Sequence, residues 1–206
     1  NTNLPKMTLA RVPLFRGLNS LQLKTIHGHI REKSFLKGDI LFFDEKPCDQ
    51  IVIVRSGRVK VFRTSSTGRE QILEILNPGD TCACNPGVSV WCCSSFSQAL
   101  TDCEVWVFPR EKYNYMVKSN SKMSQSLNEL FADRLKKFSA LIEDVSLDDP
   151  KRRLVKFILE LAAPDKNTAT SQQVSQLPFT HEEIAQRLGL VRETITRHLQ
   201  QLKRAK

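Results

Sequence analysis

The sequence predicts an α+β fold in which an antiparallel β-roll precedes a long helix and a helix-turn-helix. Short apolar runs separated by turn residues occupy residues 34–108. A helical apolar period returns over residues 110–145, and two short helices joined by a glycine follow over residues 180–199. We therefore expect three parts: 1–109 with an N-terminal helix before the roll, then 110–145, then 146–206.

Composition narrows the class of protein. The 206 residues are 40% hydrophobic and 26% charged, which is ordinary for a globular protein. No apolar run approaches the roughly 20 residues of a membrane span, and no basic-then-apolar leader opens the chain, so we expect a cytoplasmic protein. A net charge of +9 suits a polyanionic partner but does not distinguish nucleic acid from a membrane surface. We find no nucleophile–base arrangement and no phosphate loop, and expect no enzyme.

Residues 4–30 are predicted to be helical. Asn19 and Ser20 offer a helix cap before Leu21. Apolar residues recur at roughly helical spacing: Leu14, Leu18, Leu21 and Ile26.

The next segment reads as strands. Its apolar runs are 40–43, 51–54, 59–62, 71–75 and 105–108. Turn triplets punctuate them: Lys37-Gly38-Asp39, Ser56-Gly57-Arg58, Thr67-Gly68-Arg69 and Pro78-Gly79-Asp80. Strands at this spacing, with almost no helix between them, predict an antiparallel roll or barrel.

The helix expected over 110–145 has two apolar stripes. The first holds Met123, Leu127, Leu130, Leu141 and Val145, and the second holds Phe131, Leu135, Phe138 and Ile142. One stripe can lie on the roll and the other on a twin helix, which predicts a homodimer through about 116–145. On this reading, Leu127→Lys with Leu130→Lys gives monomers. A single wide core face within a monomer is the alternative.

A break at Ser146–Pro150 opens the last part, because proline and its predecessor resist continuing a helix. Lys151–Ala163 is predicted to be an amphipathic helix, and residues 164–175 a loop or short hairpin. The apolar positions of the helix are Leu154, Val155, Ile158, Leu159 and Leu161.

Residues 180–199 carry the strongest motif. Thr180 and Glu183 form a capping box, and Gly189 ends the first helix because a tight turn needs a residue that tolerates positive φ. A second helix starts near Val191. Helix, glycine turn and helix make a helix-turn-helix. The predicted inner positions are Ile184, Ala185, Leu188, Ile195, Leu199 and Leu202.

Four polar residues of the second helix point away from its apolar stripe: Arg192, Glu193, Thr196 and Arg197. Arginine can bond guanine bidentately and glutamate can accept from cytosine, so double-stranded DNA, rather than a membrane, is the predicted partner. The alternative is a pair of surface helices with solvated charges, in a roll sensor or scaffold module without sequence-specific DNA binding.

Over residues 10–206 the chain resembles the CRP/FNR family of bacterial transcription regulators. The matching motifs are the turn glycines, Asn77-Pro78-Gly79-Asp80 and the segment from Val191 to Arg197. The resemblance implies a cyclic-nucleotide-binding-type antiparallel β-roll, a long dimerisation helix and a C-terminal winged helix-turn-helix. The family's wing strands follow the recognition helix. This sequence stops at Lys206, so we expect the wing to be absent from this chain.

The resemblance also implies roles for individual residues. Arg192, Glu193 and Arg197 would read base edges, and Thr180 and Thr194 would touch phosphates. A family member of this kind is a homodimer on a palindromic operator, and an activator would also contact RNA polymerase.

The sensor part departs from the family's cAMP-binding pattern of a Gly-Glu pair followed by Arg-Ser. Counting from Asp80 places Cys84 at the glutamate, and counting back from Cys103 places Cys93 at the arginine, with one residue missing between them. A thiol cannot neutralise a phosphate as arginine can, so we do not expect cAMP to bind.

The cysteines themselves are clustered. Five of the six fall within residues 82–103: Cys82, Cys84, Cys92, Cys93 and Cys103. They suit a thiolate-bound metal such as Zn²⁺ or Cu⁺, an iron–sulfur cluster or a reversible disulfide, or they act as small hydrophobic groups. Neither close pair, Cys82 with Cys84 or Cys92 with Cys93, has the C-x-x-C spacing of a zinc ribbon. Residues 1–47, where the FNR branch holds its oxygen-sensing cluster, contain no cysteine. The effector stays open.

Overall fold

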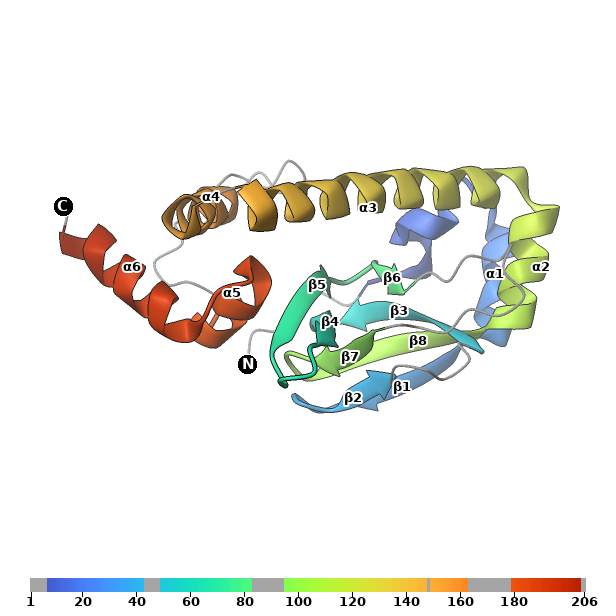
Figure 1. Cartoon of the computed structure of the whole chain (residues 1–206). Coiled ribbons are helices and arrows are strands. Elements are labelled where there is room, and N and C mark those ends of the chain that lie inside the picture. Colours follow the sequence, from blue (N-terminus) through green and yellow to red (C-terminus); the bar gives the residue numbers. More distant parts are fainter. Residues whose placement is uncertain (1–6, 43–48, 83–94, 148, 163–178, 205–206) are drawn as a thin grey trace. The chain divides into compact units, whose positions relative to one another are not determined.

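The structure is a computed structural model of the whole chain (Figure 1). It forms two compact units: Asn1–Arg63 with Leu73–Lys136, and Thr64–Ile72 with Lys137–Lys206. In the part of the chain that the structure describes, no helix is long and apolar enough to cross a bilayer. The described residues are 7–42, 49–82, 95–147, 149–162 and 179–204.

The N-terminal segment is shorter in helix than predicted. Two 3-10 turns, Leu9–Arg11 and Pro13–Phe15, precede helix α1 (Ser20–His29). The described part of the segment predicted to be helical, 7–30, is therefore helical only in pieces, because Val12 has extended backbone dihedrals and Gly17 takes a positive φ of 80°.

The predicted cap of α1 is confirmed. Asn19 Oδ1 accepts from the Gln22 amide and Gln22 Oε1 accepts from the Asn19 amide, both at 2.9 Å. Leu21, predicted to face inward, is exposed. The capping box determines where the helix begins, but not which of its sides is buried.

The strands form two four-stranded sheets, ordered β1-β8-β3-β6 and β2-β7-β4-β5. Each predicted apolar run is a strand, and β1–β8, β3–β8 and β4–β7 pair antiparallel, as a roll requires. The bounds are β1 Arg31–Phe35, β2 Ile40–Phe42, β3 Gln50–Ser56, β4 Val59–Thr64, β5 Glu70–Leu76, β6 Thr81–Cys82, β7 Phe96–Ala99 and β8 Cys103–Pro109.

Three strands were not predicted: β1, β6 and β7. Strand β1 is mostly exposed and polar, so it lacks the alternation that signals a strand. It forms because its backbone pairs with β8, in a register that places Glu32 opposite Trp106. This edge strand is a product of tertiary pairing.

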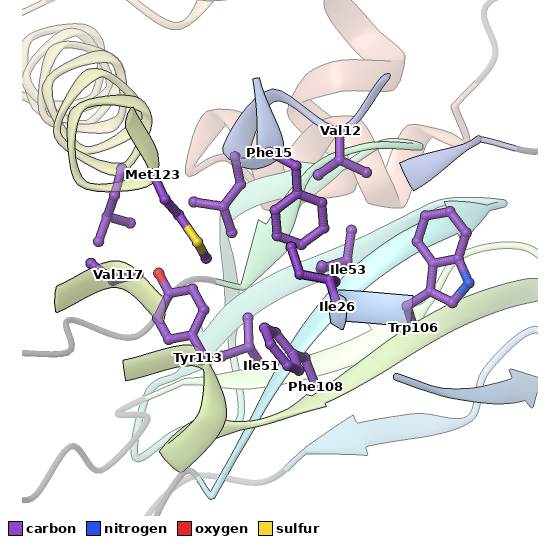
Figure 2. Close-up of a cluster of buried hydrophobic side chains, with 12 residues drawn as sticks. Val12, Phe15, Ile26, Ile51, Ile53, Trp106, Phe108, Tyr113, Val117 and Met123 are labelled. Atoms are coloured by element: carbon purple, nitrogen blue, oxygen red, sulfur yellow. The ribbon is translucent and has the colours of Figure 1, made fainter. Parts of the chain in front are cut away.

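Two apolar clusters lie on opposite faces of the first sheet. One fills the space between the sheets and includes Val54, Val59, Leu76, Ala99, Cys103, Val105 and Val107. The other lies under the N-terminal turns, α1 and the following helices (Figure 2). There the Tyr113 side chain lies among Val117, Met123 and Ile51, and its ring meets the Phe108 ring edge-on, with 6.3 Å between the ring centres. This second cluster fixes the start of the long helix on the roll.

The single helix expected over 110–145 is two helices, α2 (Arg110–Ser119) and α3 (Ser121–Leu147). Asn120 separates them with extended backbone dihedrals. Its Oδ1 accepts from the Lys122 and Met123 amides, both at 3.1 Å, and so caps α3. Asn120 is a favourable cap residue that the sequence already contains, but the prediction followed the apolar periodicity, which continues across it.

The two stripes of α3 have different environments only from Leu135 onward, because Phe131 of the second stripe packs against the same cluster as the first. Met123 and Leu127 are buried against the roll, and Leu130 packs beside them. Leu135 and Ile142 are 71% and 66% exposed, and Phe138 is 37% exposed. Substituting Leu127 and Leu130 would therefore damage the roll's own core, so they are the wrong positions for a test of dimerisation.

The second unit contains α4 (Pro150–Ala162), α5 (His181–Leu188) and α6 (Arg192–Arg204). Pro150 is the first residue of α4, a position that needs no amide donor. Phe157, which was not among the predicted apolar positions, is buried, whereas the predicted Leu159 is exposed. The core of this unit holds Leu154, Phe157, Ile184, Ala185, Leu188 and Ile195.

Candidate nucleic-acid interface

The first helix of the motif begins at the predicted capping box. Thr180 Oγ1 accepts from the Glu183 amide at 3.2 Å, and Glu183 Oε2 accepts from the Thr180 amide at 2.6 Å. The Thr180 hydroxyl also lies 3.0 Å from Glu183 Oε2. Because this hydroxyl already serves the cap, a phosphate contact from it would compete with the capping box.

The predicted turn is confirmed at Gly189, whose φ of 66° and ψ of 30° are left-handed. A side chain in this conformation costs roughly 1–2 kcal/mol. The Leu190 amide then donates to the Ala185 carbonyl at 2.9 Å, and Arg153 Nη1 donates to the Leu188 carbonyl at 2.8 Å. These bonds satisfy the end of α5 and let α6 begin at Arg192.

The angle between α5 and α6 is held by buried apolar packing. Ile184 and Ala185 of α5 meet Ile195 of α6 over the apolar face of α4. The Arg187 guanidinium lies 5.4 Å from the centre of the Phe157 ring. Burial lowers the pKa of Arg187, and the negative charge of Glu160 offsets only part of this effect. The two helices therefore form a rigid pair, as a DNA-binding site requires.

The predicted base-reading residues lie together on the first half of α6. Arg192, Glu193 and Arg197 are exposed, while Thr194 and Thr196 are half-buried. The N-terminal half of a recognition helix is the part that contacts base edges. The arrangement can therefore offer two guanidinium forks and one carboxylate to a major groove.

One residue of this site was missed. His181, at the start of α5, places its Nδ1 3.0 Å from Thr196 Oγ1. That oxygen also lies 3.0 Å from the Arg192 carbonyl. A histidine beside a cap carries no sequence signal of such a contact, because only the packing of α5 on α6 brings the two residues together.

The cysteine cluster is only partly described. Cys84, Cys92 and Cys93 lie outside the described residues, as does Cys48. Cys82 lies on β6, and Cys103 on β8. Among the residues that the structure describes, no group of three His, Cys, Asp or Glu side chains could hold a metal ion.

Cys103 has the environment of a packing residue. It is 3% exposed, and burial, with the nearby charges of Asp102 and Asp39, raises its pKa to about 11. Metals and oxidants react with the thiolate, which this environment suppresses. Cys103 is therefore poorly suited to bind a metal or to react with an oxidant.

A charged pair that the sequence did not predict joins helix α3 to the roll. Arg134 of α3 pairs with Glu74 of β5 at 3.2 Å and donates to the Thr81 carbonyl of β6. Both charged side chains are less than one-fifth exposed. Because removing one partner would leave the other charge with little solvent and no counter-charge, either substitution should weaken the packing of α3 on these strands.

Two family models match the chain. The cyclic nucleotide-binding domain covers residues 32–120, and the Crp-like helix-turn-helix domain covers residues 152–206. The "CRP-like cAMP-activated global transcriptional regulator" of Mycobacterium tuberculosis is 27% identical over 199 residues, covering 93% of this chain and 85% of that protein.

Two further comparisons agree. The "Anaerobic regulatory protein" of Pasteurella multocida is 29% identical over 188 residues, covering 91% of this chain and 68% of that protein. The solved structure of the c-di-GMP responsive global regulator CLP of Xanthomonas campestris superposes with a TM-score of 0.78 at 16% identity. The match covers 91% of this chain and 93% of that one. The structural likeness concerns the fold.

Proposed function

Since the chain belongs to the CRP/FNR family of transcription regulators and carries the family's DNA-binding helix-turn-helix, we propose that it binds a palindromic operator as a homodimer. The signal that controls binding is sensed in the roll. The observation that carries this proposal is the exposed set of Arg192, Glu193 and Arg197 on a helix braced by a buried core.

The test is a comparison of two DNA duplexes at one defined salt concentration. The full chain binds a site selected from random duplexes at least about a thousandfold more tightly than a shuffled duplex. Equal affinity for both would favour the alternative, a roll module that binds DNA only through its positive charge. Fluorescence anisotropy over several salt concentrations separates the two cases.

The homodimer is supported by the second stripe of α3. Leu135, Phe138 and Ile142 are exposed and spaced by three and four residues, the spacing of a coiled-coil seam. A twin helix related by a two-fold axis would cover this stripe. Two recognition helices about 34 Å apart would then require a palindromic site. RNA polymerase is a further partner if the protein is an activator.

The signal is not determined by family membership, because one relative is named for cAMP activation and another for anaerobic regulation. Our proposal is that the roll does not bind cAMP, since Cys84 and Cys93 occupy the places of the family's glutamate and arginine. Isothermal titration calorimetry is expected to give no heat of binding at tens of micromolar cAMP. Saturable binding in that range would show the alignment of these two cysteines to be wrong.

Sulfur chemistry in the roll is the proposed alternative to cAMP. The reactive set would be Cys82, Cys84, Cys92 and Cys93, with Cys103 as the unreactive contrast. A pKa near 11 leaves about one thiolate in a thousand at pH 8, so alkylation of Cys103 should be slow there, rise about tenfold per pH unit and level off only near pH 11.

The corresponding experiment replaces those four cysteines with serine. DNA affinity of parent and variant is compared with and without oxidant, Zn²⁺, Cu⁺ and reconstituted iron–sulfide, and Cys103→Ser is the control. The parent's affinity should change about 5–150-fold with the active signal, and the fourfold variant should not respond. A variant that responds like the parent under every condition would make these cysteines packing residues.

The contact of Arg134 with Glu74 and the Thr81 carbonyl supports a route for the signal within the first unit. Thr81 adjoins Cys82, and Arg134 adjoins Leu135 of the exposed stripe. A change at β6 would therefore act on the helix that carries the proposed dimer face. A signal of this kind shifts the equilibrium only by its difference in affinity for the two states.

A further inference from the structure

The Thr196 side chain, on the DNA-facing half of α6, has its hydroxyl group committed inside the domain. Oγ1 lies 3.0 Å from the Arg192 carbonyl one turn earlier, and 3.0 Å from His181 Nδ1. A carbonyl can only accept, so the hydroxyl proton belongs to the bond with Arg192. His181 must then donate through Nδ1–H to the threonine oxygen, which fixes the tautomer of the neutral ring.

These two bonds limit what Thr196 can offer to a base. Its only donor proton is used, and one of its two acceptor positions is filled. What remains is one acceptor position on Oγ1 and the Cγ2 methyl, which takes no part in either bond. In the major groove, the C5-methyl of thymine is the partner that a threonine methyl contacts, and none of the other three bases carries it.

From these contacts we propose that Thr196 recognises a thymine of the operator through its methyl group, with His181 as the positioning residue that holds it. The inference rests on the proposed reading of DNA by α6. Thr196 follows Glu193 by three residues and directly precedes Arg197, so it lies on the same side of α6 as these two exposed residues. Its methyl would therefore meet a base pair next to those that the charged side chains read. A hydroxyl contact to a base is the competing interpretation.

The first experiment removes the methyl group from the DNA. With the full chain and its selected operator, each thymine is replaced in turn by uracil, which lacks only the C5-methyl. At one position of the half-site, the replacement should weaken binding about fourfold, and about fifteenfold in both half-sites together, as expected for one buried methyl group at each. Thr196→Ser keeps the hydroxyl and should bind the thymine and uracil operators equally.

Matched variants separate the methyl from the hydroxyl. Thr196→Val keeps a methyl and removes the hydroxyl, so it should still prefer thymine at that position. His181→Asn keeps a donor nitrogen at the same number of bonds from the backbone as Nδ1, and should retain the preference. His181→Gln places its amide one bond further out, and should reduce the preference for thymine at that position.

Three results would overturn the proposal. The first is that uracil replaces every thymine without loss, and the second is that Thr196→Ser discriminates as the parent does. The third is that Thr196→Val loses affinity tenfold while Thr196→Ser binds like the parent. The last result would assign the contact to the hydroxyl. A chain that selects no preferred duplex would refute the proposed function itself, and this inference with it, whereas a preferred site without the uracil effect refutes the inference alone.

Discussion

Leu135→Lys combined with Ile142→Lys is expected to convert the dimer into monomers that no longer bind the operator. Both side chains are exposed in the single chain, so the substitutions leave the roll's own core intact. In the dimer they would place four charges in an apolar seam. Losing four apolar side chains from such a seam costs at least about 6 kcal/mol, or roughly ten-thousandfold in the dimer's Kd.

Light scattering at micromolar concentration measures the mass, and anisotropy measures operator binding in the same samples. Leu159→Lys is the matched control, because Leu159 is a similarly exposed leucine on a different helix, α4. It should stay dimeric and bind the operator. A double variant that still runs as a dimer would show that α3 is not the dimer helix.

Arg197→Ala is expected to weaken binding to the preferred operator by about 1–3 kcal/mol, or roughly 5–150-fold, and to relax the preference at one base pair. The reason is the exposed position of Arg197 in the first half of α6, where a guanidinium can bond one guanine bidentately. Affinities for the operator and for its single-base variants, measured at one salt concentration, test both effects.

Arg204→Ala supplies the comparison for Arg197. Arg204 lies on the same helix in its last turn and is also exposed. Its loss should weaken binding to all duplexes alike, through a phosphate contact or a reduced positive charge. An Arg197→Ala variant that behaves the same way, with equal loss on every sequence, would show that Arg197 meets phosphate rather than a base.

The helix-turn-helix could be predicted because its signals are local. The capping box at Thr180 and Glu183 and the left-handed turn at Gly189 each involve residues within one turn of chain, and the structure confirms both. The apolar periodicity of α5 and α6 likewise located Ile184 and Ile195 in the core. Local hydrogen-bonding and steric preferences act on neighbouring residues, so a sequence can be read for them directly.

Where the prediction failed, longer-range packing decided the outcome. Strand β1 exists because β8 offers it a backbone partner, and nothing in its polar sequence indicates a strand. Leu21 and Leu159 fit an apolar helical stripe but are exposed, whereas Phe157 became the centre of a core. The periodicity gives a range of buried directions, and the neighbouring elements choose among them.

Local patterns in the sequence were enough to predict the α+β class, the strands with apolar runs, the two apolar stripes of the long helix and the exposed polar face of α6. Packing between distant elements determines which apolar side chains of α3 lie on the roll, namely Met123, Leu127, Leu130 and Phe131. It also determines that Arg134 pairs with Glu74 and that His181 holds Thr196. Capping and periodicity depend on residues within a few positions of each other. A side-chain contact between residues 15 or 60 positions apart depends instead on how whole elements pack, and a single sequence contains no local signal for that packing.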